Sequence, residues 1–135
     1  MKALIISDGS ESIQSLALII KESLYSANSS IKTVICHAKD FKGNELLPAD
    51  IFFIGCEAPS PSSFSWVEDF FSHINLASRK CGIFSVKTKT VNYLRGILKD
   101  SDADVAEPFL AEKGEVKKAE IKKWLKQFLG KTGKA

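Results

Sequence analysis

The sequence is poor in the residues that mark secreted, metal-binding or membrane proteins. Its 135 residues include only three cysteines, two histidines and one methionine. Cysteines this few and this widely spaced form neither a disulfide framework nor a zinc site, so we predict no metal and a cytoplasmic location. The first apolar run, residues 3–6, is too short for a signal peptide or a membrane span. We therefore predict no membrane partner.

The composition is that of one globular domain, with 44% apolar and 26% charged residues. We predict a single folded unit over residues 1–130 and a short basic tail over residues 131–135. The net charge of +3 is mild. The lysines near the C-terminus alternate with glutamates and lack an aromatic platform, so we predict no nucleic-acid partner. They form either a solvated helix face or a docking surface for an acidic partner.

Five short apolar segments have the length and β-branched content of strands. They span residues 2–6, 31–36, 51–55, 81–86 and 105–111. The segment 51–55 is apolar on both faces, which is typical of a central strand covered on both sides. Pro108 cannot donate a ladder hydrogen bond, so the last segment is predicted to lie at the sheet edge or to be broken.

Segments with helical periodicity separate these strands. Their apolar stripes are Ile13, Leu16, Ala17, Ile20 and Leu24; Val67, Phe70, Phe71 and Ile74; Val91, Leu94 and Leu98; and Val116, Ile121, Trp124, Leu125 and Phe128, ending near Gly130. The connection over residues 39–48 is lean, with one helical turn at most. Alternating strands and helices predict an α/β three-layer sandwich with a five-stranded parallel sheet. Ligands bind such sheets at the carboxyl ends of the strands, here loops 7–12, 56–64 and 85–90.

Two stretches give the chain a resemblance to the flavodoxin family over nearly all of its length. One is the opening KALIIS at residues 2–7, and the other is LLPADIFFIG at residues 46–55. The second resembles the flavodoxin lead-in, which ends in an acidic residue and runs directly into the third strand and its terminal glycine. The resemblance implies a strand order of 2-1-3-4-5. It also implies an electron carrier rather than a catalyst, which binds FMN and serves redox partner proteins.

The resemblance also implies where FMN would lie, with its phosphate in the first loop and its ring between the other two. Carried onto this sequence, the cofactor-binding residues are Ser7, Gly9, Ser10, Glu11 and Ser12; Cys56, Glu57, Ala58, Pro59 and Trp66; and Ser85, Val86 and Lys87. Hydroxyls, flexible backbone and a helix N-terminus are suited to a phosphate.

The loops depart from the family's pattern in their charges. Glu11 replaces the family's usual Asn, and Asp8 adds a second carboxylate. A carboxylate that points into the loop would repel a phosphate, whereas an outward Glu11 simply stabilises the first turn of a helix. Lys87 and Lys89 stand where the family has a Gly-rich aromatic loop, and they would favour anionic flavin or bind a different anion.

The aromatic residues near the second loop come later than the family places them. Phe64 is interpreted as a residue of the helix start packed on the sheet, while Trp66 either packs there too or reaches a flavin ring.

Other functional classes find less support. A phosphorylatable receiver domain needs an Asp after its third strand, where this chain has Gly55-Cys56-Glu57, and no G-x-G-x-x-G motif is present for a dinucleotide. His37 and His73 are predicted to be surface or capping residues. Cys56 is either a thiol nucleophile at the site or a buried strand-end residue.

Two hypotheses remain. In the first, the chain binds FMN and transfers electrons; the loop serines and Trp66 favour this one. In the second, it has lost FMN binding and acts as an anion-binding or protein-interaction domain, its pocket re-lined by Glu57, Pro59, Pro61, Lys87 and Lys89. Fold alone does not choose between them.

Overall fold

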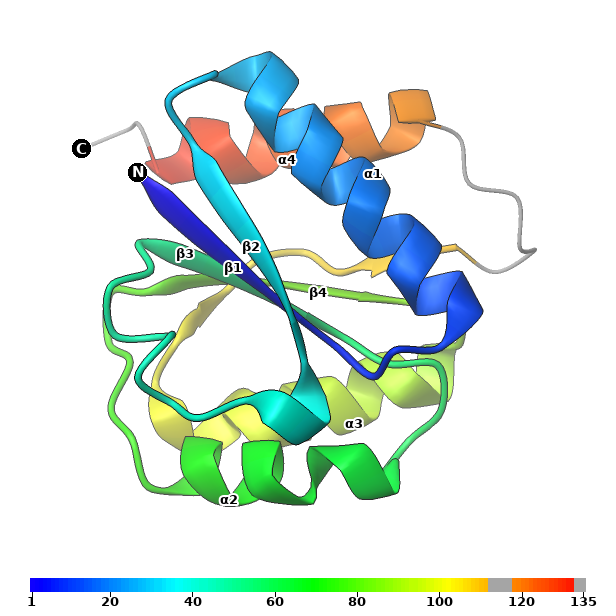
Figure 1. Ribbon diagram of the computed structural model, residues 1–135, viewed down its shortest axis with the longest axis vertical. Helices are drawn as coiled ribbons and strands as arrows, with labels where there is room; N and C mark the ends of the chain where they lie inside the picture. The colour runs from blue at the N-terminus through cyan, green and yellow to red at the C-terminus, as the bar shows by residue number, and fades with distance from the viewer. Residues whose placement is uncertain (112–117, 133–135) are drawn as a thin grey trace.

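The computed structural model describes residues 1–111 and 118–132 as a sheet between two layers of helices (Figure 1). The strands are β1 Lys2–Ser7, β2 Lys32–His37, β3 Ile51–Gly55, β4 Lys80–Ser85, β5 Asp104–Val105 and β6 Phe109–Leu110. The helices are α1 Glu11–Ala27, α2 Ser65–Ser72, α3 Thr88–Leu98 and α4 Lys118–Thr132, with 3₁₀ turns η1 Ala38–Asp40, η2 Ser62–Phe64 and η3 Lys99–Ser101. None of the helices in these ranges has the length and apolarity that a bilayer crossing requires.

The sheet is parallel, with the strand order β2-β1-β3-β4-β5 and with β6 also paired to β4. This confirms the predicted α/β class and strand order. The predicted fifth strand is divided into two pieces of two residues each, β5 and β6, separated by Ala106, Glu107 and Pro108. The division follows from Pro108, which lacks the N–H that a continuous ladder requires.

Apolar side chains cover both faces of the sheet, and β3 is buried along its whole length. Phe52 and Ile54 join the core beneath α2 and α3, whereas Ile51 and Phe53 join the core beneath α1 and α4. The predicted stripe of α1 is fully buried against the second of these cores. Burial at about 25 cal/mol per Å² of apolar surface is the main stabilisation of such a fold.

The start of α3 differs from the sequence prediction. The predicted loop 87–90 contains the first turn of this helix, because Lys87 acts as its N-cap and the Lys87 carbonyl accepts the N–H groups of Thr90 and Val91. Thr90 is fully buried. Only Val86 and Lys87 therefore separate β4 from α3.

Two other helix ends also differ from prediction. Helix α2 ends at Ser72, so Ile74 lies beyond it and His73 is its C-cap. Helix α4 continues to Thr132, past the end predicted near Gly130. Its predicted start at Val116 and the tail residues 133–135 lie outside the described residues.

The connection from β2 to β3 contains no α-helix, and η1 is the one helical turn in residues 38–50, all of which are described. The Arg79 guanidinium holds this segment by donating to the carbonyl oxygens of Leu46, Leu47 and Ala49 at 2.9, 3.0 and 2.7 Å. The lean connection leaves Val34 of β2 56% exposed.

Candidate functional site

Three loops meet at the edge where β1, β3 and β4 end side by side (Figure 1). Two side chains tie the second and third loops together. The Ser85 hydroxyl donates to the carbonyl oxygen of Cys56 at 2.8 Å, and the Thr90 hydroxyl donates to the carbonyl oxygen of Glu57 at 2.9 Å. The structure thus brings the three predicted loops into one contiguous site.

Asp8 joins the first loop to the second. Its Oδ1 accepts hydrogen bonds from the backbone N–H of Ser10 at 3.0 Å and from the Ser10 hydroxyl at 2.7 Å. Its Oδ2 accepts the backbone N–H of Glu57 at 2.9 Å. Ser10 is the N-cap of α1, so the Asp8 carboxylate occupies the helix N-terminus, where an anion is favoured by the helix dipole.

Ser7 makes two further hydrogen bonds at the first loop. The Gly9 N–H donates to Ser7 Oγ at 3.0 Å, and the Ser7 hydroxyl donates to Gln14 Oε1 at 3.3 Å. Gly9 has φ +80°, and a Cβ there would lie 2.3 Å from Nε2 of His37, so this imidazole covers the glycine. His37 also caps η1 by accepting the Lys39 N–H at 3.2 Å, a capping role that agrees with its sequence interpretation.

The carboxylates of the site point in different directions. The Ser12 hydroxyl donates to Glu57 Oε2 at 2.8 Å, whereas Glu11 is exposed in the first turn of α1. Of the two orientations considered from the sequence, Asp8 takes the inward one and Glu11 remains exposed to solvent. A phosphate here would approach Asp8 and Glu57 together, at about 1 to 4 kcal/mol for each pair of unit charges roughly 4 Å apart.

The aromatic residues do not form two walls for a flat ring. Phe64 is fully buried in η2, as expected, while Trp66 in the first turn of α2 is 49% exposed. The link of Val86 and Lys87 between β4 and α3 contains no aromatic residue. Tyr93, the next aromatic, lies on α3 and donates its hydroxyl to a glutamate of α2.

Cys56 is fully buried and its thiol donates to the carbonyl oxygen of Ala58 at 3.4 Å. Burial, with a smaller contribution from the charge of Asp8, raises the pKa of this thiol far above its ordinary value. The sulfur therefore stays protonated, which favours the structural interpretation over the nucleophile. Among the described residues, no group of three or more His, Cys, Asp or Glu side chains is arranged to hold a metal ion.

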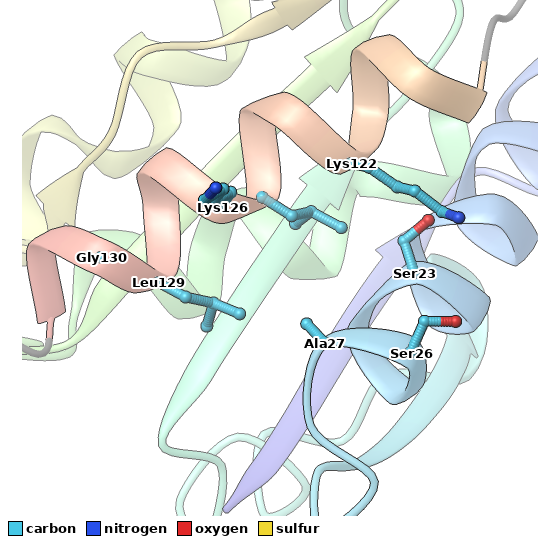
Figure 2. Close-up of a pocket in the computed structure, with 8 residues that line it drawn as sticks. Ser23, Ser26, Ala27, Lys122, Lys126, Leu129 and Gly130 are labelled. Atoms are coloured by element: carbon cyan, nitrogen blue, oxygen red, sulfur yellow. The ribbon is translucent and has the colours of Figure 1, made fainter.

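A hollow of about 660 Å³ lies away from the loops, between the C-terminal part of α1 and α4 (Figure 2). Ser23, Ser26 and Ala27 line it from α1, and Lys122 and Lys126 line it from α4. It is an open surface depression with an apolar floor. None of the residues that line it belongs to the three loops.

Sequence reasoning missed the roles of Thr90 and Gln14 in closing the loops. For Thr90 the sequence did offer a signal, because this residue directly precedes Val91 of the predicted apolar stripe. It lies on the buried side of α3. For Gln14 the sequence offered no signal, because its partner is chosen by the path of the loop.

The comparison with solved structures supports the fold described above. No family model and no curated protein matches the sequence. Among solved structures, flavodoxin 1 from Bacillus cereus is 16% identical, with a TM-score of 0.80 over 96% of this chain and 97% of that one. A short-chain flavodoxin associated with a non-canonical PDU bacterial microcompartment is 17% identical, with a TM-score of 0.79 over 98% of both chains. A mutant flavodoxin from Fusobacterium nucleatum bound to flavin mononucleotide is 8% identical, with a TM-score of 0.76 over 96% of both. The chain therefore has a flavodoxin-like fold.

Within that fold, two features of this site oppose the binding of FMN. At the first loop Asp8 already holds the Ser10 and Glu57 donors, and the third loop is two residues long with no aromatic. The arrangement provides three loops joined by hydrogen bonds, with polar and aromatic side chains exposed around them.

Proposed function

We propose that this flavodoxin-like chain works without FMN, as a domain that binds another protein through its loop edge. The observation that carries the proposal is the position of the Asp8 carboxylate. It already takes three donors from Ser10 and Glu57, at distances of 2.7 to 3.0 Å. A phosphate would have to displace a charge that is built into the fold.

The energy of that displacement is considerable. Hydrogen bonds to a charged group contribute about 1.5–3 kcal/mol each, and three of them would be exchanged. The displaced carboxylate and that of Glu57 would then both repel the incoming dianion. A partner protein that contacts the exposed side chains around the loop edge leaves the Asp8 hydrogen bonds in place.

The second loop has the properties of a protein contact. Residues 57–60, which include Ala58 and Pro59, are all exposed. Ser60 adopts a left-handed φ of 52°, and the loop is anchored by the bonds from Ser85 and Thr90. A loop held in one shape loses little entropy on binding.

Trp66 adds an exposed indole next to this loop, and Trp is enriched among the residues that dominate binding energy. Lys87 and Lys89 are exposed at the start of α3. The partner that fits these side chains offers an apolar pocket for Trp66 and carboxylates for the lysines.

FMN-dependent electron transfer is the second candidate function. It is favoured by the meeting of three loops at the N-terminus of α1, by the exposed Trp66, and by a structural neighbour that is bound to flavin mononucleotide. It requires Asp8 to turn out of the loop. Redox partner proteins would then be the partners, and the chain would be a flavoprotein of electron transport.

Titration of the purified protein with FMN separates the two candidates. Under our proposal the protein is colourless, and FMN fluorescence is unchanged up to about 100 µM protein, a concentration at which binding of about 5.5 kcal/mol would half-saturate the FMN. An established apoflavodoxin serves as the positive control. A yellow preparation, or stoichiometric quenching at micromolar concentration, would overturn the proposal and support the flavin alternative.

A photo-crosslinking residue at position 66 tests the interaction itself, with Lys123 on the exposed side of α4 as the control position. We expect a discrete crosslinked product between this chain and a partner protein from position 66, and no such product from position 123. Identical products from both positions would contradict a specific contact at the loop edge.

A further inference from the structure

We propose that two copies of this chain pair edge to edge through β2, so that their two sheets join into one. This interface is independent of what the loop edge binds. It rests on the unpaired backbone of β2, the exposure of Val34, and the charges that two opposed copies would bring together.

Strand β2 has one partner in the described part of the chain, which is β1 (Figure 1). The Lys32 N–H donates to the carbonyl oxygen of Met1 at 3.0 Å, so the backbone groups of Lys32 face β1. Because these groups alternate along a strand, the N–H and C=O groups of Thr33, Ile35 and His37 point away from the sheet. They form a ready edge for a further strand.

The middle of the β2 edge lacks the features with which proteins usually block pairing. The strand keeps a regular register with β1 over six residues, and residues 33–36 contain neither a charge nor a proline, although Lys32 stands at its start. The opposite edge of the sheet is blocked, because it consists of two-residue strands interrupted at Pro108. An unblocked edge of β-branched residues favours strand addition.

Val34 lies on the face covered by α2 and α3, since it pairs with buried Leu4. It is 56% exposed and lines a hollow of about 290 Å³ together with Lys2, Lys32, Glu45 and Pro48. The lean connection between β2 and β3 leaves this face open. An apolar side chain from a further strand would fill it.

The alternation of the backbone restricts the register of two opposed β2 strands to a few choices. In each of them a two-fold axis perpendicular to the sheet passes between the two copies of one residue, and we place it at Val34, the exposed apolar residue of the strand. With the axis at Val34, the two Val34 side chains meet as a non-hydrogen-bonded pair, where side chains come closest. Thr33 and Ile35 then exchange backbone hydrogen bonds across the interface.

This register also brings opposite charges together. Lys32 of one copy stands opposite Cys36 of the other, and Glu45 Oε1 lies 3.7 Å from Cys36 Sγ. Burial, with the charges of Glu45 and Asp40, raises the pKa of the Cys36 thiol to about 11, so the sulfur itself carries no charge at neutral pH. The Lys32 ammonium of each copy thus meets an acidic neighbourhood on the other, twice over.

Helix α1, which packs against β2, also carries exposed apolar side chains. Leu18 and Tyr25 are 48% and 64% exposed. They are seven residues apart and so share one side of α1, nearly opposite its buried stripe. An interface of one strand pair is modest in area, so we expect a weak, concentration-dependent dimer with a dissociation constant of about 50 µM.

Sedimentation equilibrium from about 1 to 200 µM tests the association, with the Val34→Lys variant as the disruptive change. Val34→Lys places two ammonium groups opposite each other at the axis and should weaken the dimer at least tenfold. Leu47→Lys is the control, since Leu47 is 59% exposed but lies outside the strand. A wild-type chain that stays monomeric at 200 µM, or a dimer that tolerates Val34→Lys, would overturn the proposal.

A charge exchange tests the register. Lys32→Glu and Glu45→Lys should each weaken association, because like charges then face each other, and the double variant should recover most of the lost affinity. Recovery cannot arise from a general loss of folding. A double variant weaker than both single variants would contradict the Val34 register.

A cysteine at the axis gives a second measure of the register. In the Val34→Cys variant the opposed Cα atoms are about 4.5 Å apart, within the range that a disulfide spans, so an interchain bond should form under mild oxidation. The three natural cysteines are buried, so the wild-type chain measures the cross-linking that occurs without the Val34→Cys change. Leu47→Cys is the matched control, and equal cross-linking from both positions would count against the interface.

Discussion

The loop edge and the β2 edge of the same sheet differ in how far their polar groups are satisfied. At the loop edge, Asp8, Ser85 and Thr90 hold neighbouring loops through hydrogen bonds of 2.7 to 3.0 Å. At the β2 edge, outward backbone groups lack a strand partner, and the buried Thr33 hydroxyl has no hydrogen-bond partner in the described structure. The named polar groups of the loop edge are thus paired within the chain, whereas the outward backbone groups of β2 are not.

The largest expected effect comes from disturbing the packing beneath the loop edge. A Cβ added to Gly55 would lie 2.5 Å from the ring of Phe84, which is fully buried and has no room to move. We expect Gly55→Val to lower the free energy of unfolding by about 3 kcal/mol, the upper range for overpacking. Urea denaturation measures this change.

Gly96→Val is the matched control for this prediction, because a Cβ at Gly96 meets nothing within 4 Å. Its effect should be much smaller. If the two variants lose equal stability, the loop edge is not held by the close fit of β3 against β4.

The next effect tests the hydrogen-bonded centre of the loop edge. Asp8→Ala leaves the N–H groups of Ser10 and Glu57 without their acceptor, and we expect it to lower the free energy of unfolding by about 2 kcal/mol. Glu11→Ala, which removes an exposed carboxylate three residues away, should change it by less than about 0.5 kcal/mol. Equal effects in urea denaturation would show that Asp8 is no more than a surface charge.

The contrast between Asp8 and Glu11 also shows where sequence reasoning stops. The stripe of α1, the buried β3 and the effect of Pro108 follow from local periodicity and backbone chemistry, and all three were predictable. The inward turn of Asp8 depends on the Glu57 N–H, 49 residues further along the chain. No local pattern encodes that contact.

The third loop illustrates the same limit from another side. Lys87-Thr88-Lys89-Thr90 is polar enough to be interpreted as a loop, but the tertiary bond from Thr90 to Glu57 and the burial of Thr90 favour a helical turn there. Conversely, the sequence before β3 has no apolar stripe, so the absence of a helix there could be predicted. The exposure of Val34 could not be predicted from this alone, because it also depends on the order of the strands in the sheet.

The smallest expected change in the free energy of unfolding lies at the β2 edge. A small change there distinguishes this edge from the loop edge. Because Val34 is 56% exposed, Val34→Lys should change the free energy of unfolding of the dilute monomer by no more than about 0.5 kcal/mol. The same substitution should strongly weaken association at high concentration. Urea denaturation at about 1 µM, set beside sedimentation at 200 µM, separates the two quantities. A large loss of monomer stability would mean that Val34 serves the fold, and the β2 edge would then be as closed as the loop edge.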